Sequence, residues 1–177
     1  LLMTCIGHVP EINFALPSSP TETGLVVAML PATTALAPVT LAQFVKMTVE
    51  KPQDPDFDQL ITRYRQFHRA LSAGLLKSAH DVSEGGVLSA VAELALGSVG
   101  VALKMNQAST TDLFGEGPGM IVFTFEEKNL TEVEKLIPGL KRIGVTTSQT
   151  GLTLSTGSEE LSWSLDELSC SHKGAGK

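Results

Sequence analysis

One short run of polar residues and glycines, Ser78 to Gly86, does most to restrict how this chain can fold. It reads Ser-Ala-His-Asp-Val-Ser-Glu-Gly-Gly and directly precedes an apolar segment, Val87 to Leu96, whose composition favours a helix. Ser83 is a good helix N-cap, and the first N–H groups of a helix lack backbone partners and carry a partial positive charge. Glycines at this place let a ligand approach those N–H groups. The run therefore predicts an anion site, with phosphate as the expected anion.

The same run also has a purely structural interpretation, which stays open. Ser83 would then only cap the helix, the two glycines would allow close packing, and Glu84 would place a negative charge beside the proposed anion. Residues that could contact phosphate or substrate, or orient the run by hydrogen bonds, are His80, Asp81, Ser83, Gly85 and Gly86.

Length and charge restrict the class of protein. The 177 residues, 42% of them hydrophobic, suit one folded domain, which we place at residues 1–168, followed by a disordered tail at 169–177. A net charge of −6 without clustered lysine and arginine argues against a nucleic-acid partner. No apolar run reaches the roughly 20 residues that cross a bilayer, and no signal peptide is visible, so we expect a cytoplasmic protein without membrane contact.

Cysteine and histidine positions indicate no metal site. Cys5 and Cys170 lie at opposite ends of the chain, and none of the 4 histidines pairs with a cysteine at a zinc-binding spacing. No arrangement of Ser, His and Asp or of Cys and His indicates a nucleophile, and no Walker-type loop occurs. We therefore assign no catalytic and no metal-binding residue in this chain.

Helix and strand patterns alternate irregularly along the sequence. Asp54 and Pro55 mark a helix start, and the apolar residues from Phe57 to Leu75 recur at three- and four-residue steps, which predicts one face in the core. Gly74 fits the end of that helix. Short apolar runs predict strands at 1–9, 24–30, 100–105, 120–125, 141–146, 152–155 and 160–163, and helices at 39–49 and 131–137. Since no regular βαβ repeat appears, we expect an α+β domain with a mixed β-sheet flanked by helices.

A second polar cluster, Asp112 to Gly119, precedes the strand predicted at 120–125. Three of its glycines surround Glu116, which suggests a shaped loop that presents the carboxylate. A plain connection between strands is the alternative. We keep Glu116 as a candidate residue near the site of the Ser78–Gly86 run.

The order of these segments is more informative than any one of them. Ala79-His80-Asp81-Val82-Ser83-Glu84-Gly85-Gly86-Val87 resembles the AHDVSEGGL signature of the superfamily related to aminoimidazole ribonucleotide (AIR) synthase. Leu113-Phe114-Gly115-Glu116 resembles its LFGES motif, and the runs 92–95, 100–101, 143–145, 152–154 and 163–168 follow in family order. The chain is most similar to the second C-terminal-type domain of the phosphoribosylformylglycinamidine synthases, over about residues 55–168.

This resemblance implies an AIR-synthase C-terminal-domain-like fold and a place in a larger ligase of purine biosynthesis. Such enzymes convert formylglycinamide ribonucleotide to the amidine: ATP activates the amide oxygen, and ammonia released from glutamine displaces the phosphate. It implies ATP and Mg²⁺ as cofactors, bound mainly outside this chain. As partners it implies the remaining synthase domains, a glutaminase domain or subunit and, as a further option, a second copy of the chain.

Two departures from the family pattern limit the expected role. Glu116 is followed by Gly117 and Pro118, where the family's first-copy domain carries Ser and Gln that touch substrate. Residues 31–35 replace a glycine-rich segment. We therefore expect a scaffold that borders or contributes to a phosphate site and is inactive alone. The alternatives are a non-catalytic dimerisation or subunit-docking domain, and another superfamily member of the selenophosphate, thiamine-phosphate or hydrogenase-maturation type.

Overall fold

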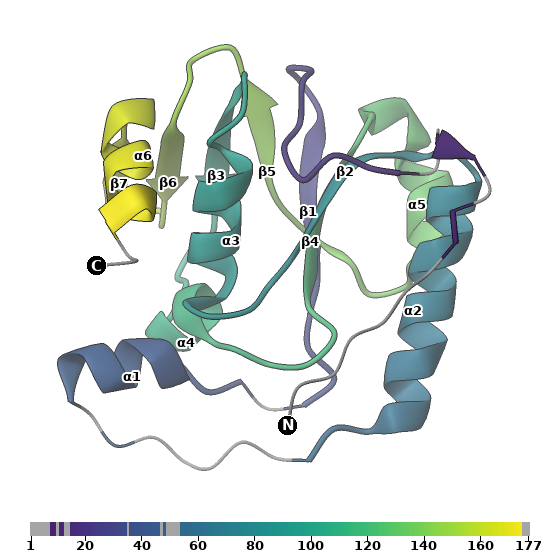
Figure 1. Ribbon diagram of the computed structural model, residues 1–177, viewed down its shortest axis with the longest axis horizontal. Coiled ribbons are helices and arrows are strands. Elements are labelled where there is room, and N and C mark those ends of the chain that lie inside the picture. The colour runs from purple at the N-terminus through teal and green to yellow at the C-terminus, as the bar shows by residue number, and fades with distance from the viewer. Residues whose placement is uncertain are drawn as a thin grey trace.

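A mixed seven-stranded sheet runs through the molecule (Figure 1). The computed structural model describes residues 8, 9, 11, 12, 15–34, 36–46, 48 and 54–174. The strands follow in chain order as β1 (Val26–Leu30), β2 (Leu76–Asp81), β3 (Gly100–Lys104), β4 (Ile121–Phe125), β5 (Lys141–Thr147), β6 (Leu152–Ser155) and β7 (Glu160–Trp163). Their order across the sheet is β2-β4-β1-β5-β3-β6-β7, and each neighbouring pair is antiparallel except β3 with β6. The predicted α+β class with a mixed sheet is confirmed.

Helices cover both faces of this sheet (Figure 1). Within the described residues they are α1 (Val39–Val45), α2 (Phe57–Ser72), α3 (Gly86–Leu94), α4 (Thr110–Phe114), α5 (Leu130–Leu136) and α6 (Leu165–Gly174), with a short 3₁₀ turn at Glu127–Asn129. Side chains of α3, α4 and α6 pack into the core on one face, and side chains of α2 and α5 pack into the core on the other.

Strand β1 belongs to both cores. Val27 and Met29 pack with α3, whereas Val26, Ala28 and Leu30 pack with α2 and α5. All five residues are buried, which explains why the strand is a continuous apolar run without polar alternation.

The long helix α2 begins two residues later than the sequence predicts. Asp56, and not Asp54, is the N-cap, and its Oδ1 accepts the backbone N–H of Gln59 at 3.0 Å. At the other end Gly74 has φ +68° and donates to the carbonyl of Leu71, while the next residue donates to the carbonyl of Ala70. These two bonds form a Schellman motif, so the predicted role of Gly74 is confirmed.

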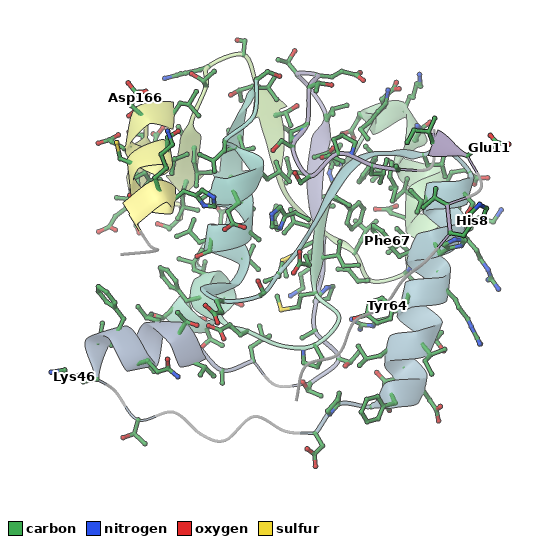
Figure 2. All side chains as sticks on the ribbon, in the orientation of Figure 1. His8, Glu11, Lys46, Tyr64, Phe67 and Asp166 are labelled. Carbon is green, nitrogen blue, oxygen red and sulfur yellow. The ribbon has the colours of Figure 1, made fainter. Side chains whose placement is uncertain are left out.

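Only part of the apolar face of α2 reaches the core. Phe67 packs edge to face against Phe123 of β4, with 5.5 Å between the centres of the two rings. Phe57, Ile61 and Tyr64 are 68%, 46% and 48% exposed, so the prediction of one continuous core face is wrong for them. Figure 2 labels Tyr64 and Phe67 on this helix.

Three further predictions need correction. Residues Ser78–Asp81, where the sequence predicts no strand, belong to a strand because they pair with β4. A short helix, α4, lies between residues 106 and 119, where the sequence predicts neither helix nor strand, and a capping box between Ser109 and Asp112 starts it. The tail expected to be disordered from residue 169 is helical in α6 as far as Gly174.

The strand predicted at 1–9 and Cys5 lie almost wholly outside the described residues. His8 and Val9, which are described, are exposed and belong to no strand.

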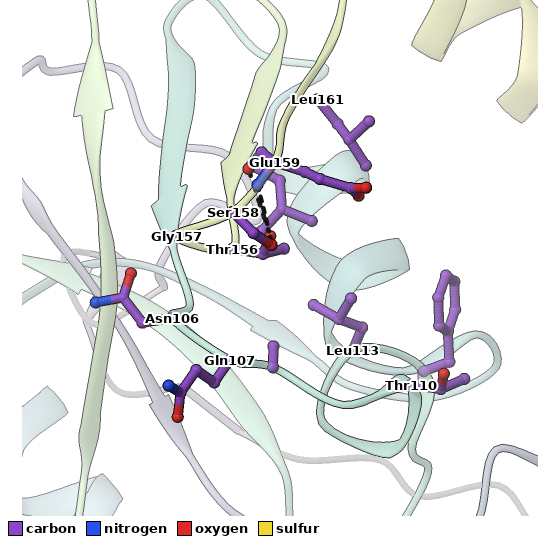
Figure 3. Close-up of a pocket in the computed structure, with 12 residues that line it drawn as sticks. Asn106, Gln107, Thr110, Leu113, Thr156, Gly157, Ser158, Glu159 and Leu161 are labelled. Atoms are coloured by element: carbon purple, nitrogen blue, oxygen red, sulfur yellow. Dashed lines mark hydrogen bonds between the residues drawn. The ribbon is translucent and has the colours of Figure 1, made fainter.

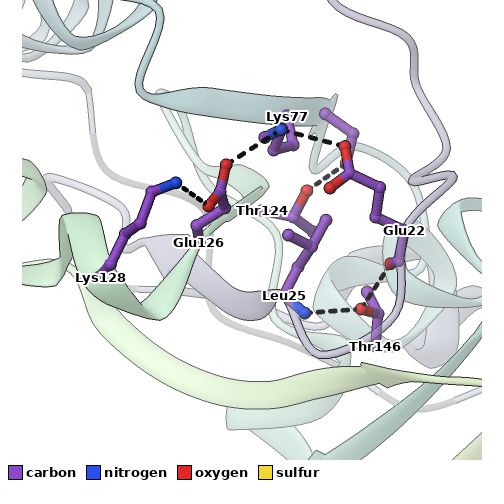
Figure 4. Close-up of polar contacts among 8 residues, drawn as sticks. Glu22, Leu25, Lys77, Thr124, Glu126, Lys128 and Thr146 are labelled. Atoms are coloured by element: carbon purple, nitrogen blue, oxygen red, sulfur yellow. Dashed lines mark hydrogen bonds and ion pairs between the residues drawn. The ribbon is translucent and has the colours of Figure 1, made fainter.

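Polar side chains tie strands together at one end of the sheet (Figure 4). The buried hydroxyls of Ser78 and Thr124 share a hydrogen bond of 2.7 Å between β2 and β4. Lys77 contacts Glu22 at 3.0 Å and Glu126 at 3.1 Å, and the hydrogen bonds that it donates to these carboxylates raise the pKa of Lys77. These contacts hold the strand that leads into the Ser78–Gly86 run.

Candidate functional site

The Ser78–Gly86 run passes from the end of β2 through a turn into α3. The N–H of Val82 donates to the carbonyl of Met120 at 3.1 Å, which continues the pairing with β4. The N–H of Gly86 then donates to the carbonyl of Ser83 at 3.2 Å. Gly85 is the N-cap of α3 with φ +81°, and no side chain caps the helix. The prediction that Ser83 caps this helix is therefore wrong, because the turn closes through its backbone carbonyl.

Close packing against backbone explains Gly86, whereas Gly85 is favoured by its left-handed backbone conformation. A Cβ on Gly86, whose φ is +69°, would lie 2.5 Å from the carbonyl carbon of Phe114 and 2.9 Å from the oxygen of Gly115. A Cβ on Gly85 would lie 2.2 Å from Oγ of Ser89. The start of α3 thus lies directly against the backbone that leads into Glu116.

The carboxylate of Glu116 lies at the start of α3. Its Oε1 accepts the N–H of Gly85 at 3.1 Å and the N–H of Thr40, in α1, at 2.9 Å. The backbone of Glu116 also exchanges hydrogen bonds with Ala37, at 3.0 Å and 3.4 Å. The carboxylate of Glu116 therefore accepts the N–H of Gly85, for which the sequence predicted an external anion as partner.

His80 and Asp81 belong to a different group of side chains. His80 donates from Nδ1 to the carbonyl of Asp81 at 2.7 Å, and its Nε2 lies 3.2 Å from Oε2 of Glu93 in α3. The other oxygen of Glu93 lies 3.7 Å from Nδ1 of His172 in α6. This group joins β2, α3 and α6.

The predicted site residues thus fall into two groups. Gly85, Gly86 and Glu116 are in direct contact, and Ser83 contributes its carbonyl to the same turn. His80 contacts Glu93 of α3, and Glu93 in turn lies near His172 of α6. Three residues that contact these two groups were not among the site residues predicted from the sequence: Thr40, Glu93 and His172. Thr40 acts through its backbone and leaves no signal in the sequence, whereas Glu93 belongs to the run 92–95 that matched the superfamily.

An open cavity lies beside the same loop. It measures about 810 Å³ and opens between α4, the turn after β3 and the β6–β7 turn (Figure 3). Leu113 and Phe114 form part of its wall, so the segment that ends in Glu116 contributes to both features. Polar side chains that line it are Asn106, Gln107, Thr110, Thr156, Ser158 and Glu159. Its mixed lining suits a polar ligand or a contacting loop, and nothing in the sequence indicated it.

The described residues lack two other kinds of feature. No three His, Cys, Asp or Glu side chains gather there as a metal ion would require. No helix of that part of the chain has the length and apolar character to cross a membrane.

Comparisons with known proteins place this geometry in a family. The sequence pattern of the family described as "AIR synthase related protein, C-terminal domain" matches residues 31–156. The phosphoribosylformylglycinamidine synthase subunit PurL of Lactobacillus helveticus is 26% identical over 174 residues, which cover 92% of this chain and 22% of that protein. The chain therefore spans less than a quarter of the length of this curated relative.

Solved structures share the fold. PurL of Thermotoga maritima complexed with FGAR superposes with a TM-score of 0.74 at 15% identity, over 88% of this chain and 29% of that one. The hydrogenase maturation protein HypE of E. coli superposes with a TM-score of 0.60 at 14% identity, over 85% of this chain and 52% of that one. Because the family pattern covers most of the chain, including both glycine-bearing motifs, this chain belongs to the AIR synthase related protein, C-terminal domain family.

Proposed function

We propose that this chain is the second C-terminal-type domain of a phosphoribosylformylglycinamidine synthase, an ATP-dependent ligase of purine biosynthesis. The whole enzyme would convert formylglycinamide ribonucleotide to the amidine with ammonia derived from glutamine. The observation that carries the proposal is the hydrogen bond from Gly85 to Glu116, because it joins the two motifs of the family resemblance in one place. The 26% identity to PurL along 92% of the chain supports it.

The packing at the start of α3 favours a scaffold role for this domain. The N–H of Gly85 already has a carboxylate acceptor, and Gly86 is explained by its close approach to the backbone of Phe114. The Ser83–Gly86 turn would then border a phosphate site completed by other domains, and the fragment alone would be inactive.

Cofactors and partners of the whole enzyme follow from the same proposal. PurL of Thermotoga maritima has been solved in complex with ATP and with ADP, which supports ATP as a cofactor. As the family resemblance implies, ATP and Mg²⁺ would be bound mainly by other domains of the enzyme. The partners would be the remaining synthase domains and a glutaminase domain or subunit, in the cytoplasm.

A non-catalytic docking or dimerisation domain is the second candidate function. The exposed Phe57, Ile61 and Tyr64 of α2 favour it, because such a stripe is typical of a contact surface. The other superfamily types, including hydrogenase maturation, share the fold and have no further support among the contacts of the site.

A domain exchange tests the synthase proposal. The matching segment of the Lactobacillus helveticus PurL is replaced by this chain, and ATP-dependent amidine formation is measured with ammonium as the nitrogen source. We expect activity in the chimera and in its Ser83→Ala variant, because Ser83 acts through its backbone. A folded chimera without activity would contradict the synthase assignment, whereas an active chimera inactivated by Ser83→Ala would contradict the scaffold role alone.

Calorimetric titration of the isolated chain separates the scaffold role from a phosphate site. We expect no heat of binding with inorganic phosphate, ATP or formylglycinamide ribonucleotide. Saturable phosphate binding that Ser83→Ala abolishes would show that the turn is itself an anion site.

A further inference from the structure

The exposed stripe on α2 has the spacing of a helix–helix contact. Phe57, Ile61, Tyr64 and His68 follow one another at steps of four, three and four residues, and all four are exposed. This alternation is that of the a and d positions of a coiled coil, which meet a partner helix along one seam.

A shallow depression lies on the C-terminal half of this stripe. It measures about 470 Å³ and is lined by Ile61, Tyr64, Arg65, His68 and Arg69. The first four stand at positions i, i+3, i+4 and i+7, the set that forms the hole for one side chain of a facing helix. Phe57 lies one turn before Ile61 and projects into solvent as a side chain of the kind that fills such a hole.

The N-terminal half of the stripe on one copy of the chain is complementary to the C-terminal half on a second copy that runs antiparallel to it. A two-fold axis beside Ile61 would pair two α2 helices antiparallel. A residue four positions before Ile61 in one copy would then face the residues three to four positions after Ile61 in the other copy. Phe57 of each copy then meets the depression of the other, and Ile61 meets Ile61. This is the reciprocal contact that a two-fold interface requires.

Charges on one edge of the stripe fit the same arrangement. Asp58 stands three residues before Ile61 and Arg65 four residues after it, on the same flank of the helix, and both are exposed. In an antiparallel pair these flanks face each other, which brings Asp58 of one copy beside Arg65 of the other, twice. A parallel pair would bring equal charges to the same level. Exposed ion pairs add little affinity, so their effect is on orientation.

We propose that α2 is a self-association surface through which two copies of this chain pair antiparallel, with Phe57 of each copy in the depression of the other and Asp58 against Arg65 across the interface. This surface needs neither the synthase reaction nor its ligands. The 16 residues of α2 make a helix of about 24 Å, so the interface is small and the dimer depends on concentration.

Analytical ultracentrifugation of the 177-residue chain over a concentration series tests the contribution of Phe57 to the proposed interface. We expect a monomer–dimer equilibrium that Phe57→Ala weakens about 100-fold, because two phenylalanine side chains lose their burial. Phe44→Ala is the matched control, since Phe44 of α1 is 88% exposed and lies outside α2. Circular dichroism verifies that both variants fold. A chain that stays monomeric up to about 1 mM, or a dimer that both variants weaken equally, would overturn the proposal.

A charge exchange tests the antiparallel geometry. We expect D58R and R65D each to weaken self-association about tenfold, because like charges then meet at both ends of the interface. The D58R/R65D double variant should dimerise like the wild type, and an equimolar mixture of the two single variants should form a heterodimer. A mixture that associates no more strongly than its components would overturn the antiparallel assignment.

Discussion

Glu116 links segments that are far apart in the sequence through one carboxylate oxygen. Its Oε1 accepts N–H groups of Gly85 and Thr40 in a half-buried place. Removal of the side chain leaves both donors unpaired, so Glu116→Ala should lower the free energy of unfolding by about 1–3 kcal/mol. Urea denaturation measures this loss, and Glu116→Gln, which keeps an acceptor oxygen, should lose less.

The control for this prediction is Glu134→Ala on the exposed side of α5. A substitution at such a surface position changes stability by no more than about 0.5 kcal/mol. Equal losses for Glu116→Ala and Glu134→Ala would mean that the two hydrogen bonds contribute nothing to stability.

Asp112 is a residue whose titration depends mainly on one neighbour, Ser109. Hydrogen bonds from the side chain and then the backbone of Ser109 lower the pKa of Asp112. Because the pKa is lower in the folded than in the unfolded state, its contribution to stability is present above the unfolded pKa and is lost as the pH falls through the folded pKa. Ser109→Ala should raise the pKa of Asp112, as followed by carboxyl NMR titration.

Glu167 serves as an internal control in the same spectra. Hydrogen bonds from Ser164 lower its pKa in the same way, and Ser109→Ala does not touch them. If the pKa of Glu167 shifts together with that of Asp112, the change is global and the local cause assigned to Ser109 is wrong.

At the scale of elements, the sequence predicts best where an element is a continuous apolar run or ends at a glycine. Strand β1 and the Schellman end of α2 follow directly from their residues. Strand β2 does not, because it reads Leu-Lys-Ser-Ala-His-Asp and its buried Ser78 is satisfied by Thr124, a partner 46 residues away. Local polarity favours a loop there, and only tertiary pairing makes it a strand.

The glycines at the end of α2 and the start of α3 lead to an element-scale prediction. Gly74 has φ +68° and Gly86 has φ +69°, but only at Gly86 would an added Cβ lie within 3 Å of backbone atoms, whereas the space beside Gly74 is open. Gly74→Ala should cost about 1–2 kcal/mol through backbone strain alone. Gly86→Ala should cost about 1–3 kcal/mol more, because the start of α3 must move away from Phe114. Thermal or urea unfolding measures both.

Equal losses for the two alanine variants would contradict the close approach of α3 to the Phe114 backbone. That approach is the contact that brings the Ser78–Gly86 run to Glu116, so the comparison also tests the candidate site. Both glycines look alike in the sequence, and the difference arises only from what lies beside them.

On the scale of the whole molecule, the family signature is distributed over elements that meet only after folding. The AHDVSEGG run extends from β2 to the start of α3, and the LFGE run begins at the end of α4. A hydrogen bond between Gly85 and Glu116 joins the two runs. The order of the two runs in the chain could be recognised from the sequence. Their contact could not, and neither could the separation of His80 from that contact, because both depend on the sheet order β2-β4-β1-β5-β3. The exposure of α2 is likewise a property of packing, since its periodicity alone predicts burial.

Because the central strand β1 contributes to both cores, we expect them to unfold as one cooperative unit. Val27 packs with α3 and Val26 packs with α2 and α5, and both are fully buried. Val26→Ala and Val27→Ala should each lower the free energy of unfolding by about 1–3 kcal/mol. Because one strand serves both faces, each substitution should shift the unfolding of both cores together.

Two probes on opposite faces can measure this cooperativity. Trp163, the single tryptophan, packs against the α3 core, and the ring of Phe123 lies in the α2 core. In both valine variants, Trp163 fluorescence and the NMR signals of the Phe123 ring should report coincident transitions in urea. If Val26→Ala shifts the Phe123 transition and leaves the Trp163 transition in place, the faces unfold independently. In that case the contacts of β1 do not transmit stability from the α2 surface to the α3 site, and a ligand or partner on one face would leave the other unchanged.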